Sequence, residues 1–340
     1  MVHLRIVAPS HQAEHAVDLL ESSPSVCNLI YLRGAARKPE GDVILCDVAR
    51  EDASVIVSDL RELEVHHEGS IAMEDIDSQI SDAADRAERA AAGAPSDAVV
   101  WEEVESRTSE NVEMSASFLA FMVLAMLIAA VGILTDQLIL IIGAMVVGPE
   151  FGPIAGLCVA AVQKRVGLAR RSLVALLVGF PLGITMTFLF TLALDGAGVI
   201  AETFSQKGHP FTDFISNPDE FSVIVAFLAG MAGVLSLTGA KSGALVGVLI
   251  SVTTIPAAAN IGVAAALGDG EEWVGAMEQL ALNLGAILLA CIGTLYLQRR
   301  LYQRRRRAHL HDSAREAAGL PLGRSRRGPA PTPGRRAADG

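Results

Sequence analysis

The chain has 340 residues, of which 51% are hydrophobic, 5% aromatic and 19% charged. This composition excludes an intrinsically disordered protein, and the mean hydropathy of +0.42 is high for a soluble one. Taken as an average, the formal net charge of −11 argues against nucleic acid or an anionic membrane surface as a partner.

The charge is divided among three unlike blocks. Residues 1–113 hold 9 basic and 24 acidic residues, residues 114–298 hold 6 and 11, and residues 299–340 hold 12 and 3. The chain therefore has an acidic head, an apolar middle and a basic tail. We expect a cytoplasmic domain over 1–76, a helical linker over 77–113, a membrane domain over 114–298 and a largely disordered basic tail over 299–340.

The head is predicted to be a small α/β domain. Alternating residues indicate strands and helically spaced apolar residues indicate helices. In chain order we expect a strand at 2–8, a helix at 12–20, strands at 28–32 and 42–48, a helix at 52–63 and a strand at 70–76. The ferredoxin-like fold uses this β-α-β-β-α-β order. Such folds often bind small regulators in other proteins, so we expect a small-molecule regulator of the head by analogy.

Metal and cofactor signals in the head are weak. His11 and His15 are four residues apart and would share one face of a helix, but no third ligand is identifiable. Surface histidines exposed to water are the favoured interpretation. The four cysteines lack CxxC spacing, which favours packing roles over zinc or redox chemistry. We expect no cofactor.

The linker contains a helix, a break at Gly93–Pro95 and a second amphipathic stretch around Trp101. Trp101 is expected either at the membrane interface or packed on the head.

The middle block is predicted to cross a membrane six times, in preference to forming a buried all-helical core. About 20 apolar residues span a hydrocarbon core that is roughly 30 Å thick. Six windows carry no Asp, Glu, Lys or Arg except for Glu150: these are 114–135, 137–163, 172–194, 221–240, 242–268 and 279–298. Frequent glycines would allow the helices to pack closely, and they favour a homo-oligomer.

Basic residues near the ends of the spans predict that both termini are cytoplasmic. With residue 1 inside, the outer connections carry a single basic residue, Lys207. Residues 1–9 resemble a strand and not a signal peptide, and we expect a bacterial plasma membrane. The inner side carries Lys164, Arg165, Arg170, Arg171, Lys241, Arg299, Arg300, Arg304, Arg305, Arg306 and Arg307. The arginines after Gln298 are expected to anchor the topology and to contact anionic lipid, because the tail lacks the features of a nucleic-acid-binding fold.

Spans two and five carry the strongest functional signal, because both are long and are interrupted near their centres. Proline and glycine predict a break at 148–153, whereas Pro256 predicts a break or only a kink. Two interrupted helices of opposite direction indicate a 3+3 inverted repeat with a substrate or ion site at the midplane. The alternative is a pair of proline kinks that shape the bundle. The expected site residues are Gly148, Pro149, Glu150, Gly152, Pro153, Ser251, Thr253, Thr254, Pro256 and Asn260.

Glu150 is the most informative residue of this set. It is the fourteenth of the 27 residues of span two, and an intramembrane carboxylate is costly unless it is protonated, paired or hydrated. It is therefore expected to carry a proton or to coordinate a cation with nearby hydroxyl and amide oxygens. A structural ion pair with Lys241 is the alternative.

These segments resemble a known family. Ile142-Gly143-Ala144-Met145 followed by Pro149 and Gly152-Pro153 resembles the signature of the bacterial membrane family called domain of unknown function 389, an uncharacterised hydrophobic domain. The segment 247–260 resembles its second motif, and the resemblance covers about residues 115–298. Glu150 stands where the family usually has a bulky apolar residue, and a proline that often adjoins Pro256 is missing. The resemblance implies a polytopic membrane protein and no activity.

The sequence favours a transporter or channel for a small ion or solute in the lipid bilayer, regulated by its cytoplasmic head. The alternative is a membrane-anchored sensor or scaffold whose head binds a small ligand or protein. An enzyme is not expected, because HExxH and GxSxG are absent and no second intramembrane acid accompanies Glu150.

Overall fold

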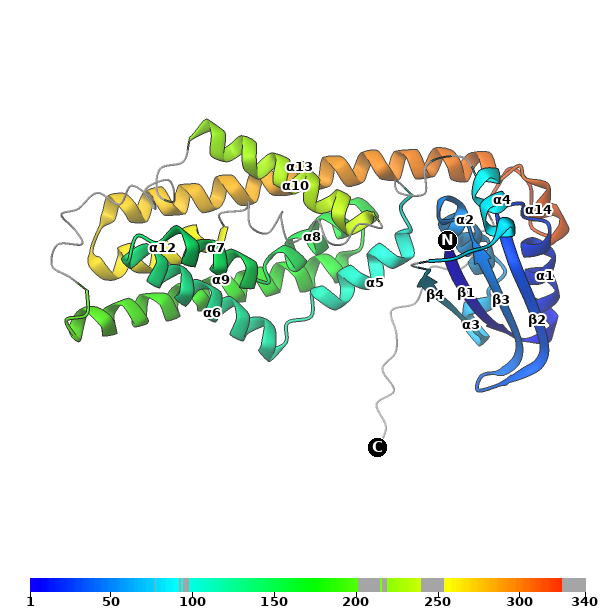
Figure 1. The fold of residues 1–340 in the computed structure, drawn as a ribbon, viewed down its shortest axis with the longest axis horizontal. Coiled ribbons are helices and arrows are strands. Elements are labelled where there is room, and N and C mark those ends of the chain that lie inside the picture. The colour runs from blue at the N-terminus through cyan, green and yellow to red at the C-terminus, as the bar shows by residue number, and fades with distance from the viewer. Residues whose placement is uncertain are drawn as a thin grey trace. The chain divides into compact units, whose positions relative to one another are not determined.

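The structure is a computed structural model that describes residues 1–76, 78–91, 93, 98–200, 215, 219–239 and 254–325. It divides into two compact units (Figure 1). The first unit consists of Met1–Glu103 and Arg300–Gly340, and the second of Val104–Arg299. The chain is mostly helical, and its sheet lies near the N-terminus.

The sheet of the first unit has four strands in the order β2-β3-β1-β4, and every neighbouring pair is antiparallel. Alternate residues of β1 face the core, so that Ile6 lies opposite Ile44 of β3 and Ile71 of β4. The strands are β1 (Val2–Ala8), β2 (Val26–Arg37), β3 (Glu40–Val48) and β4 (Ser70–Asp75).

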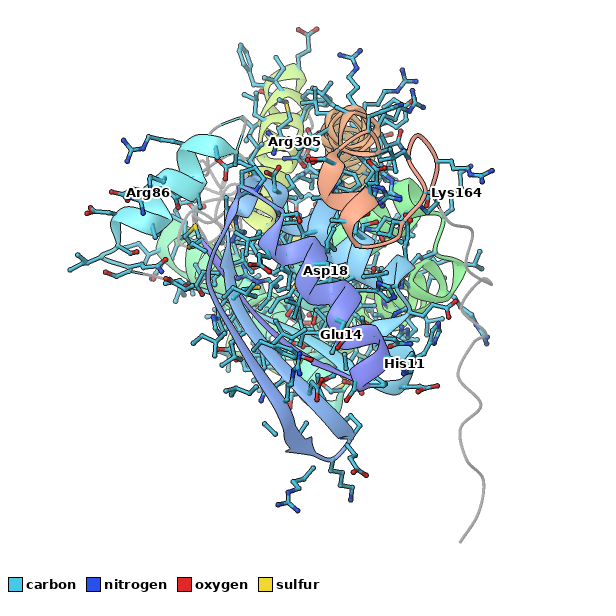
Figure 2. All side chains as sticks on the ribbon, turned by 90° about the vertical axis from the view of Figure 1, so that its right-hand side faces the viewer. His11, Glu14, Asp18, Arg86, Lys164 and Arg305 are labelled. Atoms are coloured by element: carbon cyan, nitrogen blue, oxygen red, sulfur yellow. The ribbon has the colours of Figure 1, made fainter. Side chains whose placement is uncertain are left out.

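Two helices supply most of the helical apolar side chains in the core that lies against this sheet. They are α1 (Ser10–Glu21) and α2 (Arg50–Glu62), and the short helices α3 (Val65–Glu68) and α4 (Asp82–Ala90) follow. Leu19 of α1 and Leu60 of α2 are fully buried with Leu4 of β1. The opposite side of α1 is polar, as Figure 2 shows for His11, Glu14 and Asp18. In the described part of the chain no three His, Cys, Asp or Glu side chains are grouped so that they could hold a metal ion.

The structure differs from the prediction at two places in this unit, and it decides between the two positions expected for Trp101. The loop expected between the second and third strands is shorter, because β2 continues to Arg37 and β3 begins at Glu40. The short α3 was not predicted, because four residues are too few for a periodic pattern to show. Trp101 packs on this unit: it is 5% exposed, and its backbone amide donates to the Ser54 hydroxyl at 2.8 Å.

Asp42 fixes the start of β3. Its carboxylate accepts from the backbone amide of Gly34 at 2.7 Å, from the Tyr31 hydroxyl at 2.7 Å and from the Ser10 hydroxyl at 3.2 Å. The Gly34 amide and then the Tyr31 hydroxyl stabilise the charged form, and they hold the pKa of Asp42 below its ordinary value.

The basic tail corrects the prediction of disorder over 299–340. Helix α13 (Gly270–His309) extends into this segment, and α14 (Ser313–Ala317) follows it. Ala314, Ala318 and Leu320 join the core of the first unit. Helix α14 packs against α1. Residues 326–340 lie outside the described part of the chain.

A buried ion cluster holds this segment. Asp59 of α2 is 0% exposed and accepts from Arg306 at 2.5 Å, from His309 at 2.9 Å and from Arg315. Glu62, one turn further along α2, also accepts from Arg306 and Arg315, at 2.6 and 2.9 Å. Periodicity could not reveal these partners, because some 250 residues separate them. Arg306, expected at anionic lipid, is thus bound to protein carboxylates.

The second unit is a helical bundle with apolar outer faces. Four of its helices, α6, α9, α10 and α13, are each long and apolar enough to cross a membrane, and α7 with α8 form a bent pair that passes the same test. These helices suggest a membrane location. Helix α5 (Trp101–Asn111) precedes them. Their bounds are α6 (Ala116–Leu134), α7 (Leu138–Val147), α8 (Phe151–Gln163), α9 (Val166–Gly196), α10 (Glu220–Thr238) and α12 (Thr254–Leu267), followed by α13.

Four or five such elements are therefore seen among the described residues, where the sequence predicts six spans. Helix α12 has 14 residues, about 21 Å at 1.5 Å per residue, which is shorter than a hydrocarbon core. Residues 240–253, which would form the first half of predicted span five, lie outside the described part of the chain.

Helices α8 and α12 both pack on α9, but they run along it in opposite directions (Figure 1). Gly156 of α8 lies against Ser172, near the start of α9. Gly262 of α12 lies against Ile184 and Phe188, one to two dozen residues further along α9. Since α8 ends just before α9 begins, α8 and α12 diverge from a common region beside the middle of α9.

The Asp59 cluster predicts that Arg315→Met destabilises the first unit. Removing Arg315 leaves two buried carboxylates with fewer positive partners, and breaking a buried ion pair costs about 3 kcal/mol of unfolding free energy. We expect a lower melting temperature for the purified full chain in detergent, followed by circular dichroism. The matched control is Arg307→Met, because Arg307 is exposed. Equal melting temperatures for the two variants would contradict this role for Arg315.

The hydrogen bonds to Asp42 predict a pH-dependent stabilisation. Asp42→Asn should lower the unfolding free energy at pH 7 by about 1 kcal/mol. Because the pKa of Asp42 is lowered by folding, the stabilisation is complete above the unfolded-state pKa of about 3.9 and is lost as pH falls through the lower folded-state pKa. The difference in melting temperature from wild type should be constant at pH 5–7 and shrink below about pH 4. The exposed Asp18→Asn variant is the control, and a difference that persists undiminished at pH 3 would refute the assignment.

Candidate functional site

The site lies at the break between α7 and α8. The two helices are bent by 50° relative to each other, and Gly148 ends α7 with an extended backbone. Pro149 follows, and it has no amide to continue the hydrogen bonds of α7. Residues 148–150 thus interrupt an otherwise continuous apolar segment of 26 residues, which agrees with the predicted position of the break.

Glu150 stands at the N-terminal end of α8 and is buried, with 3% of its surface exposed. Its Oε1 accepts a hydrogen bond from the Thr254 hydroxyl at 2.9 Å. Thr254 is the first residue of α12. Glu150 and Thr254 belong to different predicted spans and were predicted to share one site. The structure shows them in direct contact.

The second carboxyl oxygen, Oε2, is buried and has no hydrogen-bond partner among the described residues. It lies against Gly148: a Cβ atom at that position would be 2.4 Å from Oε2 and 2.7 Å from Cγ1 of Ile255. Only glycine therefore allows the carboxyl group and α12 to approach the end of α7 this closely. Helices α6, α7, α8 and α12 contain no Asp, Glu, Lys or Arg that could neutralise a charge on Glu150. Lys241, the predicted alternative partner, lies outside the described residues.

Two of the three prolines of the predicted site lie in the first turns of helices. Pro153 is the third residue of α8, and Pro256 is the third residue of α12. A proline in the first turn disturbs no hydrogen bond, because the amides of that turn have no acceptor within the helix. Pro153 and Pro256 therefore lie in the first turns of α8 and α12. The predicted break or kink of span five at Pro256 stays a prediction, because the residues that precede Thr254 lie outside the described part of the chain.

Of the four remaining predicted residues, two are described by the structure and two are not. Gly152 is in the first turn of α8, against Asn111 of α5. Asn260 is buried on α12, six residues and about 9 Å of helix beyond Thr254. Ser251 and Thr253 lie outside the described residues.

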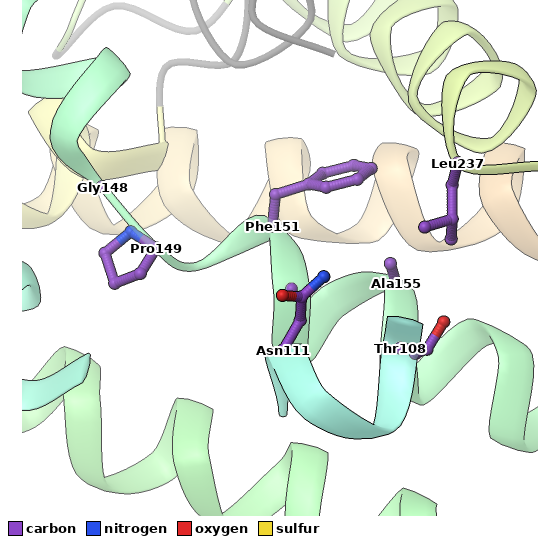
Figure 3. Close-up of a pocket in the computed structure, with 8 residues that line it drawn as sticks. Thr108, Asn111, Gly148, Pro149, Phe151, Ala155 and Leu237 are labelled. Atoms are coloured by element: carbon purple, nitrogen blue, oxygen red, sulfur yellow. The ribbon is translucent and has the colours of Figure 1, made fainter. Parts of the chain in front are cut away.

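A pocket of about 220 Å³ opens beside the break (Figure 3). One wall is formed by Gly148 and Pro149 and by the first turns of α8, and Leu237 of α10 contributes from another helix. The sequence did not indicate Thr108 and Asn111 of α5 as lining residues, because α5 is as charged as a surface helix. The lining residues are Thr108, Asn111, Gly148, Pro149, Phe151, Gly152, Ala155 and Leu237.

Further polar residues are buried in the second unit outside the ten predicted site residues. Thr187 and Thr191 of α9 are 0% exposed, and their hydroxyl oxygens have no hydrogen-bond partner among the described residues. Gly262 of α12 packs directly beside Thr187, where a Cβ would lie 3.0 Å from that of the threonine. Gln279 and Asn283 of α13 are also buried. Their spacing of four residues is a signal in the sequence, but serine, threonine and amide side chains are common in transmembrane packing.

Comparison with known proteins agrees with the resemblance seen in the motifs. Residues 145–289 match the family model described as Domain of unknown function (DUF389). The matched residues include the break and α12. An uncharacterised protein of Methanocaldococcus jannaschii is 27% identical over 202 residues, which are 57% of this chain and 58% of that protein. The match thus spans less than two thirds of the relative. No solved structure is similar.

The contact at Gly148 predicts that Gly148→Ala disrupts the site. The new methyl group would overlap Oε2 of Glu150 and Ile255, and overpacking of this kind costs about 1–3 kcal/mol. We expect a lower melting temperature of the purified protein in detergent. Gly143→Ala is the matched control, because a Cβ there meets nothing within 4 Å. The prediction fails if both variants melt like the wild type.

Proposed function

We propose that this protein, whose residues 145–289 carry the domain of unknown function DUF389, is an integral membrane transporter or channel for a small ion or solute. The pathway would pass the broken-helix site, which we define as Gly148–Glu150, Thr254 and the adjoining pocket. Glu150 would carry a proton along it. The first unit would regulate transport by binding a small molecule.

The observation that carries this proposal is the buried Glu150 carboxyl group. It has one oxygen bonded to Thr254 and the other without a hydrogen-bond partner in the described chain, and it lies between two helix starts. An ionised group in such a place is costly unless a ligand or a proton compensates its charge.

The proposed topology has six spans, with both termini in the cytoplasm of a bacterial plasma membrane. Helix α12 with the preceding apolar residues would be the fifth span, and the basic connections would be inside. An inverted repeat is supported by α8 and α12, which both carry proline as their third residue and diverge along α9. Frequent glycines in the spans support a homo-oligomer.

A ferredoxin-like fold is proposed for the first unit. Its antiparallel strand order β2-β3-β1-β4, with a helix after β1 and another after β3, supports this assignment. We propose no enzymatic activity, since the interior of α6, α7, α8 and α12 offers one carboxyl group and no partner acid.

The transport role predicts that Glu150→Gln abolishes or uncouples flux. Purified protein in liposomes should acidify or alkalinise the lumen in response to an imposed ion gradient, followed with an internal pH dye. The variant keeps the size and a hydrogen-bonding oxygen of the side chain but cannot release a proton, so we expect at least a tenfold loss of proton flux.

Glu271→Gln is the matched control, because Glu271 is exposed at the start of α13. Wild-type liposomes without flux, or equal flux in wild type and Glu150→Gln, would favour the membrane-anchored sensor or scaffold instead.

A further inference from the structure

We infer that the hairpin formed by β2 and β3 docks the first unit on the anionic surface of a lipid bilayer. The inference does not depend on transport, because it concerns only which partner the first unit binds. Three features carry it: exposed apolar side chains, a basic stretch without acids, and cations that the protein does not neutralise. The docking surface consists of Arg5, Ile30, Leu32, Arg37, Lys38 and Val43.

One face of the sheet is apolar next to this hairpin. Leu29 and Tyr31 of β2 pack against the core, so the alternate residues Ile30 and Leu32 belong to the opposite, outer face. Ile30 and Leu32 are 50% and 45% exposed. Val43 of β3 lies directly opposite Leu32 and continues the apolar strip. Contiguous apolar surface of this kind is typical of a site that contacts a protein or a membrane.

The hairpin is basic, although the domain that carries it is acidic. Residues 1–76 contain 6 basic and 14 acidic residues, but residues 22–39 contain 3 basic residues and no Asp or Glu. Arg37 ends β2, and Lys38 follows it in the turn. The hairpin extends beyond the other strands of the sheet, so these two residues lie near its tip (Figure 1). Positive charge is thus concentrated at a protruding end of an acidic domain.

The protein does not neutralise the cations at this end. Arg5, Arg37 and Lys38 are exposed, and no described residue forms an ion pair with them. Arg5 belongs to the outer face, because its position alternates with the buried core residues of β1. Arg33 has the Glu14 carboxylate 4.0 Å away, but both side chains are exposed and such a pair contributes little. These cations are therefore available to an anionic partner.

Anionic lipid matches both the charge and the apolar strip. Headgroup phosphates attract Arg and Lys, and Ile30 and Leu32 can enter the boundary between headgroups and acyl chains. Nucleic acid would offer phosphates but no apolar layer for these two aliphatic side chains. A second copy of the chain on this face would bury Arg5 beside poorly placed acids, because Asp47 is already hydrogen-bonded to three side chains and Glu74 lies on the edge strand β4.

The experiment uses the full-length protein in lipid nanodiscs with a fluorescent label at the hairpin. Ala35→Cys, at an exposed position, is labelled with bimane in a chain that carries Cys27→Ser, because the other three cysteines are buried. The discs contain phosphatidylcholine alone or mixed with phosphatidylglycerol, and brominated acyl chains quench a label that reaches the bilayer. We expect quenching only in the discs with phosphatidylglycerol, and its loss at high salt.

A label at Asp18→Cys is the control position. Asp18 is exposed on the polar side of α1, which lies on the opposite face of the sheet from the docking surface, so this label should stay unquenched (Figure 2). Equal quenching of the Ala35→Cys label with and without phosphatidylglycerol, or quenching in neither disc, would overturn the inference.

Substitution at the tip tests the charges themselves. Arg37→Gln combined with Lys38→Gln should weaken docking about thirtyfold, because each basic residue near an anionic surface contributes about fivefold. Arg86→Gln combined with Arg89→Gln is the matched control, since both arginines are exposed on α4 and the loss of charge is the same. A tip variant that is quenched like the wild type would overturn the inference. So would duplex DNA that binds the wild type but not the tip variant, because it would assign the surface to nucleic acid.

Discussion

The second unit depends on one constraint: a helix that ends in an apolar interior has no water to satisfy its terminal backbone groups. The break at Gly148–Glu150 places such ends in the interior, and the bond between Glu150 and Thr254 joins two of them. First-turn prolines reduce the number of amides that need a partner. The glycine at 148 then brings the carboxyl group, α7 and α12 together, so that the end of α7 and the starts of α8 and α12 lie at a single place.

Much of this arrangement was predictable from local sequence. Uncharged windows marked the apolar helices, and the adjoining Gly148 and Pro149 marked the break, because both residues act on the backbone where they stand. Glu150 was evident as one charge within 27 residues. The prediction that Glu150 lies near Thr254 depended on the assumption that spans two and five meet at their centres. The structure shows a hydrogen bond between these two residues.

Other features could not be predicted, because they depend on distant partners. Nothing near Thr108 and Asn111 indicates that α5 lines a pocket, since α5 carries the charges of a surface helix. Arg306 was predicted to contact anionic lipid, because a basic run near a membrane usually has that role. Its carboxylate partners, Asp59 and Glu62, lie some 250 residues earlier in the chain. Pro153 and Pro256 show a further limit: the same residue begins a helix or interrupts one according to its position.

The contribution of α14 to the first unit has a consequence for the order of synthesis. The four strands and helices α1 to α3 of this unit lie within the first 75 residues, yet Ala314, Ala318 and Leu320 belong to the same core, and Arg315 closes the charge cluster on α2. A ribosome delivers these residues only after the apolar helices have been made. The first unit therefore waits, with part of its core open, until the rest of the chain has emerged. Its last folding step can therefore occur only after the intervening helices have been synthesised.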